Sequence, residues 1–159
     1  MNLKKRVALR KILTKILAYK EVGRMDFLKQ ICYNNTYYDF IIEKDKLSVH
    51  RLLEIIALAG TTIHISITDK DSEIIKELSG TNIDKMAAEM GRIALKLIKK
   101  QHKTILHFKK EHELIDNTFV IKDQLGIKSK SSLDHIINYL ELLDCKIKTR
   151  AELCTKKPE

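Results

Sequence analysis

Proline and glycine, the residues that most often interrupt regular secondary structure, are scarce in this chain. Among 159 residues proline occurs once, at Pro158, and glycine five times. Leucine, isoleucine, lysine and glutamate are abundant instead, which favours helices over a fold of short strands and turns. With 44% hydrophobic and 32% charged residues, the chain can form an apolar core and does not have the composition of a disordered protein.

Other missing features exclude further classes of protein. No apolar run approaches the roughly 20 residues of a transmembrane helix. Lysines interrupt residues 1–20, which therefore lack the apolar centre of a secretory signal. The three cysteines, Cys32, Cys145 and Cys154, are odd in number and far apart, as is typical of reduced thiols. We therefore expect a cytoplasmic protein with one ordinary domain or two small ones.

Sequence signals for catalysis or for bound cofactors are also missing. The glycines are scattered at turns and form no phosphate-binding loop. His102 and His107 are five residues apart, a spacing that turns them away from a shared helical face, and adding His112 gives no recognised metal-ligand spacing. His50 and His135 are expected on exposed faces without a partner. We expect no enzymatic activity, no cofactor and no metal site.

What the chain has in excess is positive charge, with a formal net charge of +9. Residues 1–20 and residues 92–110 each hold seven Lys or Arg and no Asp or Glu, whereas residues 69–84 between them are mainly acidic. Solvated faces usually mix charges of both signs, so two acid-free basic stretches are typical of surfaces that face phosphates. Such surfaces attract polyanions, either nucleic acid or an anionic membrane.

Hydrophobic periodicity predicts the order of the elements. An apolar stripe predicts a helix over about residues 3–20, and the alternation in TTIHISIT predicts a strand at 61–68. A short helix is expected in SEIIKEL, within the acidic connector, and a long helix over about 82–100 with Ile93 and Leu97 on its buried face. The remaining expected helices follow Gly23, Asn34 or Asn35, Ser48, Thr104, Asp116 or Asn117, and Ser131 or Ser132.

The two halves of the chain repeat this order of elements. SVHRLLEIIALAGTTIHI (48–65) aligns without gaps with SLDHIINYLELLDCKIKT (132–149), so that a short strand at 145–149 corresponds to the strand at 61–68. Helix cap, apolar spacing, helix stop and strand all agree. This agreement indicates a duplication rather than a chance likeness of amphipathic helices.

NNTYYDF with KLSVHRLLEIIALAG, and DNTFVIK with KSSLDHIINYLELLD, resemble the lambda-repressor/Cro-like (xenobiotic-response-element) helix-turn-helix family. In that family a polar-capped recognition helix precedes a leucine-rich helix, sometimes followed by a strand. The resemblance implies a mainly α fold of two tandem helix-turn-helix-like subdomains, each with four to five helices and a short strand. The implied divisions are 1–68 and 82–150 for the subdomains, 69–81 for the acidic connector and 151–159 for a disordered tail.

The resemblance also implies which residues contact DNA, because the recognition helix enters the major groove while basic side chains hold phosphates. Asn35 and Asn117 could bond adenine or act only as helix caps, and Tyr37 and Phe119 are expected in the core. The implied base contacts are Asn34, Asn35, Thr36, Tyr38, Asp39, Asn117, Thr118, Lys122 and Asp123. The implied phosphate contacts are Lys4, Arg6, Arg10, Lys11, Lys15, Arg92, Lys96, Lys99, Lys100, Lys103, Lys128 and Lys130.

These features favour a transcriptional regulator that binds double-stranded DNA, sequence-specifically or semi-specifically, with two recognition helices in one chain. The strands at 61–68 and 145–149 could pair with each other or with a second chain, forming a homodimer. A second hypothesis is a protein-interaction module, antitoxin-like or inhibitory, built from decayed helix-turn-helix units; it would explain the absence of the family's turn glycine. A third, attachment of residues 1–20 to a membrane surface, is disfavoured because their apolar stripe lacks Trp and Phe.

Overall fold

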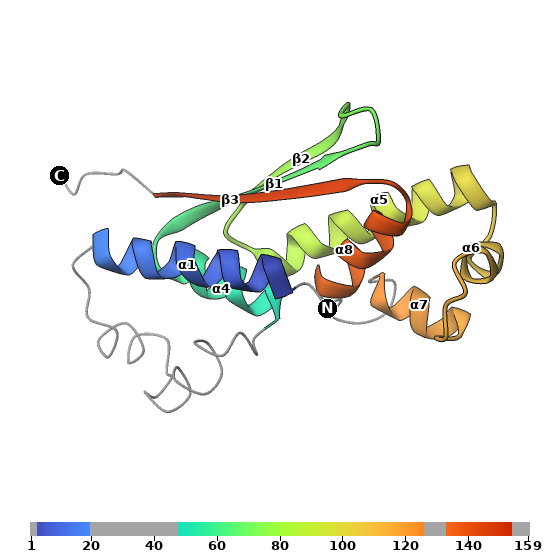
Figure 1. Cartoon of the computed structure of the whole chain (residues 1–159), viewed down its shortest axis with the longest axis horizontal. Coiled ribbons are helices and arrows are strands. Elements are labelled where there is room, and N and C mark those ends of the chain that lie inside the picture. Colours follow the sequence, from blue (N-terminus) through green and yellow to red (C-terminus); the bar gives the residue numbers. More distant parts are fainter. Residues whose placement is uncertain (1–2, 20–47, 126–132, 154–159) are drawn as a thin grey trace. The chain divides into compact units, whose positions relative to one another are not determined.

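The computed structural model of the chain describes residues 3–19, 48–125 and 133–153 (Figure 1). The chain divides into two compact units: residues 1–64, 79–81 and 150–159 form unit 1, and residues 65–78 and 82–149 form unit 2. The elements in chain order are α1 (Leu3–Tyr19), α4 (Val49–Leu58), β1 (Thr61–Thr68), β2 (Ile74–Gly80), α5 (Ile83–His102), α6 (Ile105–Glu111), α7 (Thr118–Gln124), α8 (Leu133–Leu142) and β3 (Lys146–Leu153).

The protein is a mixed α/β protein, and the expectation of a mainly α fold made of two tandem helix-turn-helix-like subdomains is wrong. Of the described residues 60% are helical and 20% lie in strands, which form a three-stranded antiparallel sheet in the order β2-β1-β3. The largest local error concerns SEIIKEL, for which a helix was predicted and which instead contributes to strand β2.

A tight hairpin between β1 and β2 is the physical reason for this difference. The backbone N–H of Ser72 donates to the carbonyl of Asp69 at 3.1 Å, and Ser72 itself has a φ of 64°. The Asp69 carboxylate accepts from the backbone N–H groups of Asp71 and Glu73 at 2.9 and 3.0 Å. A turn followed by one left-handed residue is a common three-residue hairpin connection. It returns the chain alongside β1, where β2 forms sheet hydrogen bonds in place of helical ones.

β1 lies in the middle of the sheet and has the predicted alternation, with Ile63, Ile65 and Ile67 buried. Its neighbour β3 overlaps the strand predicted at 145–149, so of the two alternatives left open by the sequence, pairing with each other or with a second chain, the structure shows the first. β3 continues to residue 153, three residues into the expected tail. Because β1 has a neighbour on each side, a homodimer through strand 61–68 would require the displacement of one of them.

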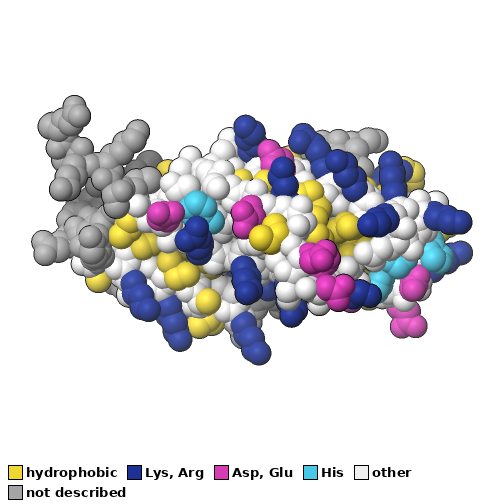
Figure 2. Space-filling model, turned by 90° about the horizontal axis from the view of Figure 1, so that it is seen from above, with side chains coloured by type: hydrophobic (Ala, Val, Ile, Leu, Met, Phe, Trp, Pro, Cys, Tyr) yellow, Lys and Arg dark blue, Asp and Glu magenta, His cyan; other side chains and the backbone are white. Residues whose placement is uncertain are grey.

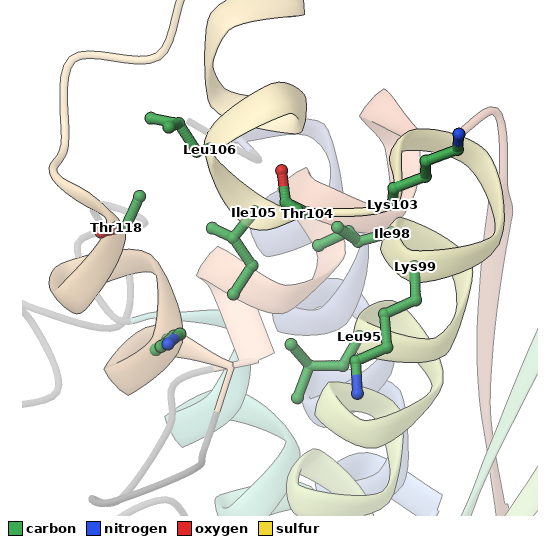
Figure 3. A pocket seen from close by; sticks show the side chains of 9 residues that line it. Leu95, Ile98, Lys99, Lys103, Thr104, Ile105, Leu106 and Thr118 are labelled. Atoms are coloured by element: carbon green, nitrogen blue, oxygen red, sulfur yellow. The ribbon is translucent and has the colours of Figure 1, made fainter.

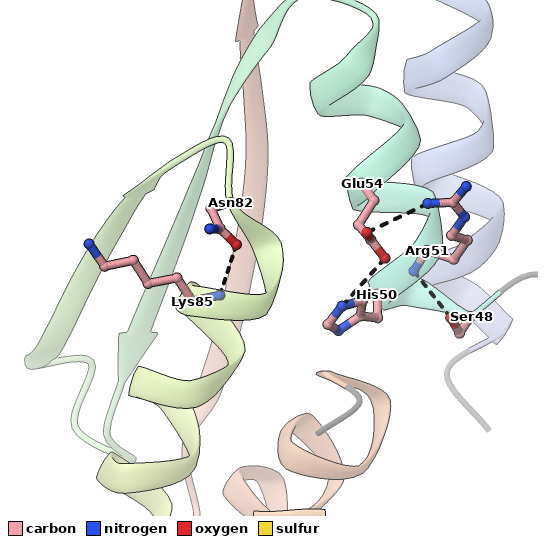
Figure 4. A network of polar contacts seen from close by, with 6 residues as sticks. All are labelled: Ser48, His50, Arg51, Glu54, Asn82 and Lys85. Carbon is pink, nitrogen blue, oxygen red and sulfur yellow. Dashed lines mark hydrogen bonds and ion pairs between the residues drawn. The ribbon is translucent and has the colours of Figure 1, made fainter. Parts of the chain in front are cut away.

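In unit 1, α1 packs against α4. α1 buries Leu9 and Leu13, and its bounds match the predicted helix over 3–20. α4 begins after Ser48, whose side-chain oxygen accepts from the backbone N–H of Arg51 at 3.1 Å (Figure 4). The predicted cap is thereby confirmed, and Gly60, with a φ of 91°, follows the end of the helix as expected.

In unit 2, the long helix α5 packs against α6 and α8, and α6 packs against α7. Asn82 caps α5 by accepting from the N–H of Lys85 (Figure 4). The buried face of α5 runs through Ala94 and Ile98; Ile93 and Leu97, which were predicted to be buried, are half-exposed. None of the described helices combines the length and the hydropathy that crossing a membrane would require.

The aligned segments 48–65 and 132–149 contain equivalent elements. α4 and α8 begin and end at the same positions of the ungapped alignment, and each is followed by a strand, β1 or β3. The paired core residues Leu52 and Ile136 are both buried, as are Ile56 and Leu140. The same apolar spacing thus produces the same helix and the same buried face in both units.

Candidate functional site

A row of basic side chains runs along the exposed face of α5 in unit 2. Arg92, Lys96 and Lys99 are all exposed and are spaced i, i+4 and i+7. At 100° per residue they fall within an arc of about 60°, opposite the buried face that includes Ala94. Within the described residues, no ion pair joins any of the three to a carboxylate. We call Arg92, Lys96 and Lys99 the basic stripe of α5.

Neighbouring residues extend this stripe at both ends. Lys85 lies two helical turns before Arg92 and is exposed, a position that the sequence analysis did not assign to phosphate binding. Lys100 and Lys103, also exposed, follow the stripe at the end of α5. The half-buried Glu89 lies at its edge. Figure 2 shows lysine and arginine side chains spread over the face that it draws, with hydrophobic and acidic side chains among them.

A pocket of about 340 Å³ lies beside the end of this stripe, among α5, α6 and α7 (Figure 3). Leu95 and Ile105 point toward its middle, whereas the amine of Lys103 extends away from it. The pocket therefore has an apolar floor with amines and hydroxyls at its rim. Its lining residues are Leu95, Ile98, Lys99, Lys103, Thr104, Ile105, Leu106, Thr118 and Lys122.

Local signals in the sequence produce the sharp corner between α5 and α6. Lys103 caps the C-terminal end of α5; it has a φ of 67° and its N–H donates to the carbonyl of Lys99. The next residue, Thr104, caps α6, its hydroxyl oxygen accepting from the N–H of His107 at 3.1 Å. This cap was predicted from the sequence and is confirmed.

The expected base-contacting residues of the second half lie at the start and on the surface of α7. Asn117, Lys122 and Asp123 are exposed, and Thr118 is half-buried. The Asn117 side-chain oxygen accepts from the N–H of Val120 at 2.9 Å, so the residue is a helix cap. A bidentate contact of Asn117 with adenine would have to share this oxygen with the cap.

The corresponding residues of the first half, together with two of the expected phosphate contacts, fall outside the described residues. The positions concerned are Asn34, Asn35, Thr36, Tyr38, Asp39, Lys128 and Lys130, and Tyr37 lies outside as well.

α1 carries the other expected phosphate contacts. Lys4, Lys11 and Lys15 are exposed and lie on one face, at i, i+7 and i+11. Arg6 and Arg10 are half-buried, and both interact with other residues of the protein. The three lysines are therefore better placed for a polyanion than the two arginines.

Phe119, which was predicted to lie in the core, is 72% exposed on α7. Three other large apolar side chains of the α6–α7 region share this exposure: Leu106 at 50%, Ile115 at 98% and Val120 at 37%. The helical spacing of TFVIKDQL does not distinguish its faces, and within α7 only Ile121 is buried. The region thus presents apolar surface next to the lysine rim of the pocket.

The predicted positions of the histidines are also wrong. His102 ends α5 and His107 lies on α6, and their rings are 5.5 Å apart, because the corner at Lys103 brings the two helices together. His50, expected to be exposed, is buried on α4, with its Nε2 atom 3.5 Å from the Glu54 carboxylate (Figure 4). The five-residue spacing would turn the rings of His102 and His107 apart only within one continuous helix, whereas the two residues lie on different helices.

A ring contact and a partly buried hydrogen bond of Tyr139 link α8 to α6 and α7. The ring of Tyr139 on α8 packs against Phe108 on α6, and its hydroxyl donates to the side-chain oxygen of Gln124 on α7. Burial, with a smaller effect of the negative charge of Asp116, raises the pKa of Tyr139 to about 12. The thiol of Cys145 is free and buried, and burial raises its pKa as well.

Comparison with known proteins gives no relative: no family model, curated protein or solved structure matches the chain.

Proposed function

We propose that this protein binds double-stranded DNA through the basic stripe of α5, and that it acts as a DNA-binding regulator in the cytoplasm. The observation that supports the proposal most is the position of Arg92, Lys96 and Lys99. They are exposed, occupy one face of one helix and have no carboxylate partner among the described residues. Such a row supplies the sequence-independent part of DNA affinity, the neutralisation of phosphates.

The basic stripe and the two exposed lysines that follow it, Lys100 and Lys103, fit the dimensions of a duplex. From Arg92 to Lys103 the chain advances eleven residues, which at 1.5 Å per residue is about 16 Å. That length equals roughly five base-pair steps of 3.4 Å, so several phosphates of one strand lie within reach. Lys122 of α7 adds an exposed amine beside the same pocket.

The salt dependence of binding to a short duplex of random sequence tests this proposal. In a variant with Arg92, Lys96 and Lys99 all changed to Gln, the negative slope of log affinity against log salt should decrease by about 2.7, at 0.9 per phosphate contact. The control variant changes Lys70, Lys76 and Lys148, which are exposed on the hairpin and strands, to Gln and so has the same net charge. An equal decrease of this slope in the two variants would contradict the proposal. So would a wild-type protein that binds no DNA at low salt.

A second candidate function, binding of a partner protein, is supported by the exposed apolar side chains of Ile115, Phe119 and Leu106. Apolar side chains next to lysines suit a partner segment with acidic and hydrophobic residues. Replacing Ile115 and Phe119 together by Ser should abolish such binding and leave the affinity for DNA unchanged. A photo-reactive residue at position 119 would identify the partner in cells, and absence of crosslinks to protein would remove this candidate.

A further inference from the structure

Three side chains with metal-binding atoms converge where α5 meets α6. His102 is the last residue of α5, and His107 and Glu111 lie one turn apart on α6. The His102 Nδ1 and His107 Nε2 atoms lie 3.0 and 3.7 Å from the same Glu111 carboxylate oxygen, Oε2. The potential ligand atoms of the three residues all lie within 4.8 Å of one another.

Two of these separations are close to those of ligands around a small cation, and the third is below 4.8 Å. Zinc binds imidazole nitrogen and carboxylate oxygen at about 2.0–2.2 Å in tetrahedral geometry, which places neighbouring ligand atoms about 3.3 Å apart. The distances of 3.0 and 3.7 Å lie on either side of this value. Small rotations of the two exposed side chains would therefore suffice to bring all three atoms into the first coordination sphere.

The environment of the three residues differs in a way that suits a metal site. His102 is 8% exposed and its ring packs against Phe108 at 5.3 Å between centroids, so its orientation is fixed by the core. His107 and Glu111 have side chains 59% and 54% exposed, so solvent can reach the position between them. His112, whose ring is 5.5 Å from that of His102, lies at the same corner.

We propose that His102, His107 and Glu111 bind a divalent transition-metal ion of the zinc type. Two imidazoles and one carboxylate form a borderline donor set that suits zinc better than magnesium or calcium. Three protein ligands leave a coordination position for water or for another donor. The ion links the end of α5 to α6 and stabilises the corner that carries Lys103 and Thr104 beside the pocket. This site does not depend on whether the protein binds DNA.

Calorimetric titration of the full-length protein with zinc chloride, after removal of metals with a chelator, tests the site. One equivalent should bind, and His107→Ala and Glu111→Gln should each weaken binding by more than about tenfold, since each removes one of three ligands. Both side chains are more than half exposed, so these variants should keep the fold, which circular dichroism checks. His135→Ala, a half-exposed histidine of α8, is the matched control and should bind zinc like the wild type.

The thermal midpoint gives an independent measurement. Zinc should raise the Tm of the wild type and of His135→Ala, because a ligand that binds only the folded state stabilises it. It should leave the Tm of His107→Ala nearly unchanged. The proposal is overturned if the wild type binds no zinc, or if it binds zinc with an affinity and Tm shift that His107→Ala and Glu111→Gln share. In the second case the ion is bound elsewhere, and His102 and Glu111 only share a hydrogen bond.

Discussion

At the scale of single residues, Gly91 shows most clearly how packing between helices determines which residue a position can hold. It lies in the middle of α5, where glycine costs helix stability relative to alanine. A Cβ atom at this position would overlap the carbonyl oxygen of Leu125 and lie 3.0 Å from its carbonyl carbon. The absence of a side chain therefore lets α5 approach the end of α7. The prediction that the glycines lie at turns is therefore wrong for Gly91, which lies within α5.

Gly91→Ala should destabilise the protein, although the same change at a free helix position would stabilise it. We expect a loss of about 1–3 kcal/mol in the free energy of unfolding, because the obstacle is backbone and cannot rotate away. Urea denaturation measures this loss. Ala88→Gly, at a half-exposed position of the same helix, is the control for helix propensity and should cost about 1 kcal/mol. A stabilised Gly91→Ala variant would show that α5 and Leu125 are not in close contact.

The raised pKa of Tyr139 predicts a loss of stability at high pH. The unfolded chain releases this proton near the ordinary pKa of 10.0, whereas the folded protein holds it to about 12. The free energy of unfolding should therefore fall as the pH rises from 10 to 12. Tyr139→Phe should be less stable at neutral pH, because Gln124 loses its hydrogen bond, but its stability should decline less over this range. Parallel curves for the two proteins in urea denaturation between pH 9 and 11.5 would contradict the assignment to Tyr139.

At the scale of elements, strand β2 shows how a turn overrides local propensity. The apolar residues of SEIIKEL are spaced in a way that is compatible with one helical turn. The segment lacks the alternation of apolar and polar residues that would indicate a strand. DKDS between β1 and β2 contains the decisive information, since Asp is favoured at the first position of such a turn and accepts backbone hydrogen bonds. Once the turn forms, the segment lies beside a strand with unpaired backbone groups.

Asp69→Ala should therefore loosen the hairpin, because two backbone N–H groups lose their acceptor. We expect a cost of about 1–2 kcal/mol and faster hydrogen exchange of the β2 amides. Asp71→Ala is the matched control: it removes an exposed carboxylate from the same turn and leaves the Asp69 acceptor in place. Equal exchange rates in the two variants would mean that the hydrogen bonds to the Asp69 carboxylate do not stabilise the hairpin.

At the scale of the whole molecule, the positive charge is divided between the two units. Unit 1 presents Lys4, Lys11 and Lys15 on one face of α1, and unit 2 presents the basic stripe of α5. The net charge of +9 is thus carried in part by two helices, each with its lysines opposite its buried face. Each of the two helices therefore presents its own basic surface for contacts with phosphates.

Changing Lys4, Lys11 and Lys15 together to Gln should also lower the salt dependence of DNA binding, by up to about 2.7 in slope. The six-site variant that adds Arg92, Lys96 and Lys99 should lose about twice as much, because independent phosphate contacts add. Gel-shift titration at several salt concentrations measures both. If the α1 variant behaves like the control variant at Lys70, Lys76 and Lys148, only unit 2 contacts DNA.

The sequence by itself determined the helices α1, α4, α5, α6, α7 and α8, three of the helix caps and the central strand. Each of these follows from apolar periodicity and from side chains that bond their own backbone, which are local properties. Only the tertiary structure decided the mixed α/β fold, the close approach at Gly91, the exposure of Phe119 and the meeting of His102 with His107. These depend on how one element turns against the next: a single left-handed residue at Lys103 or Ser72 redirects the chain and sets which distant side chains share a surface.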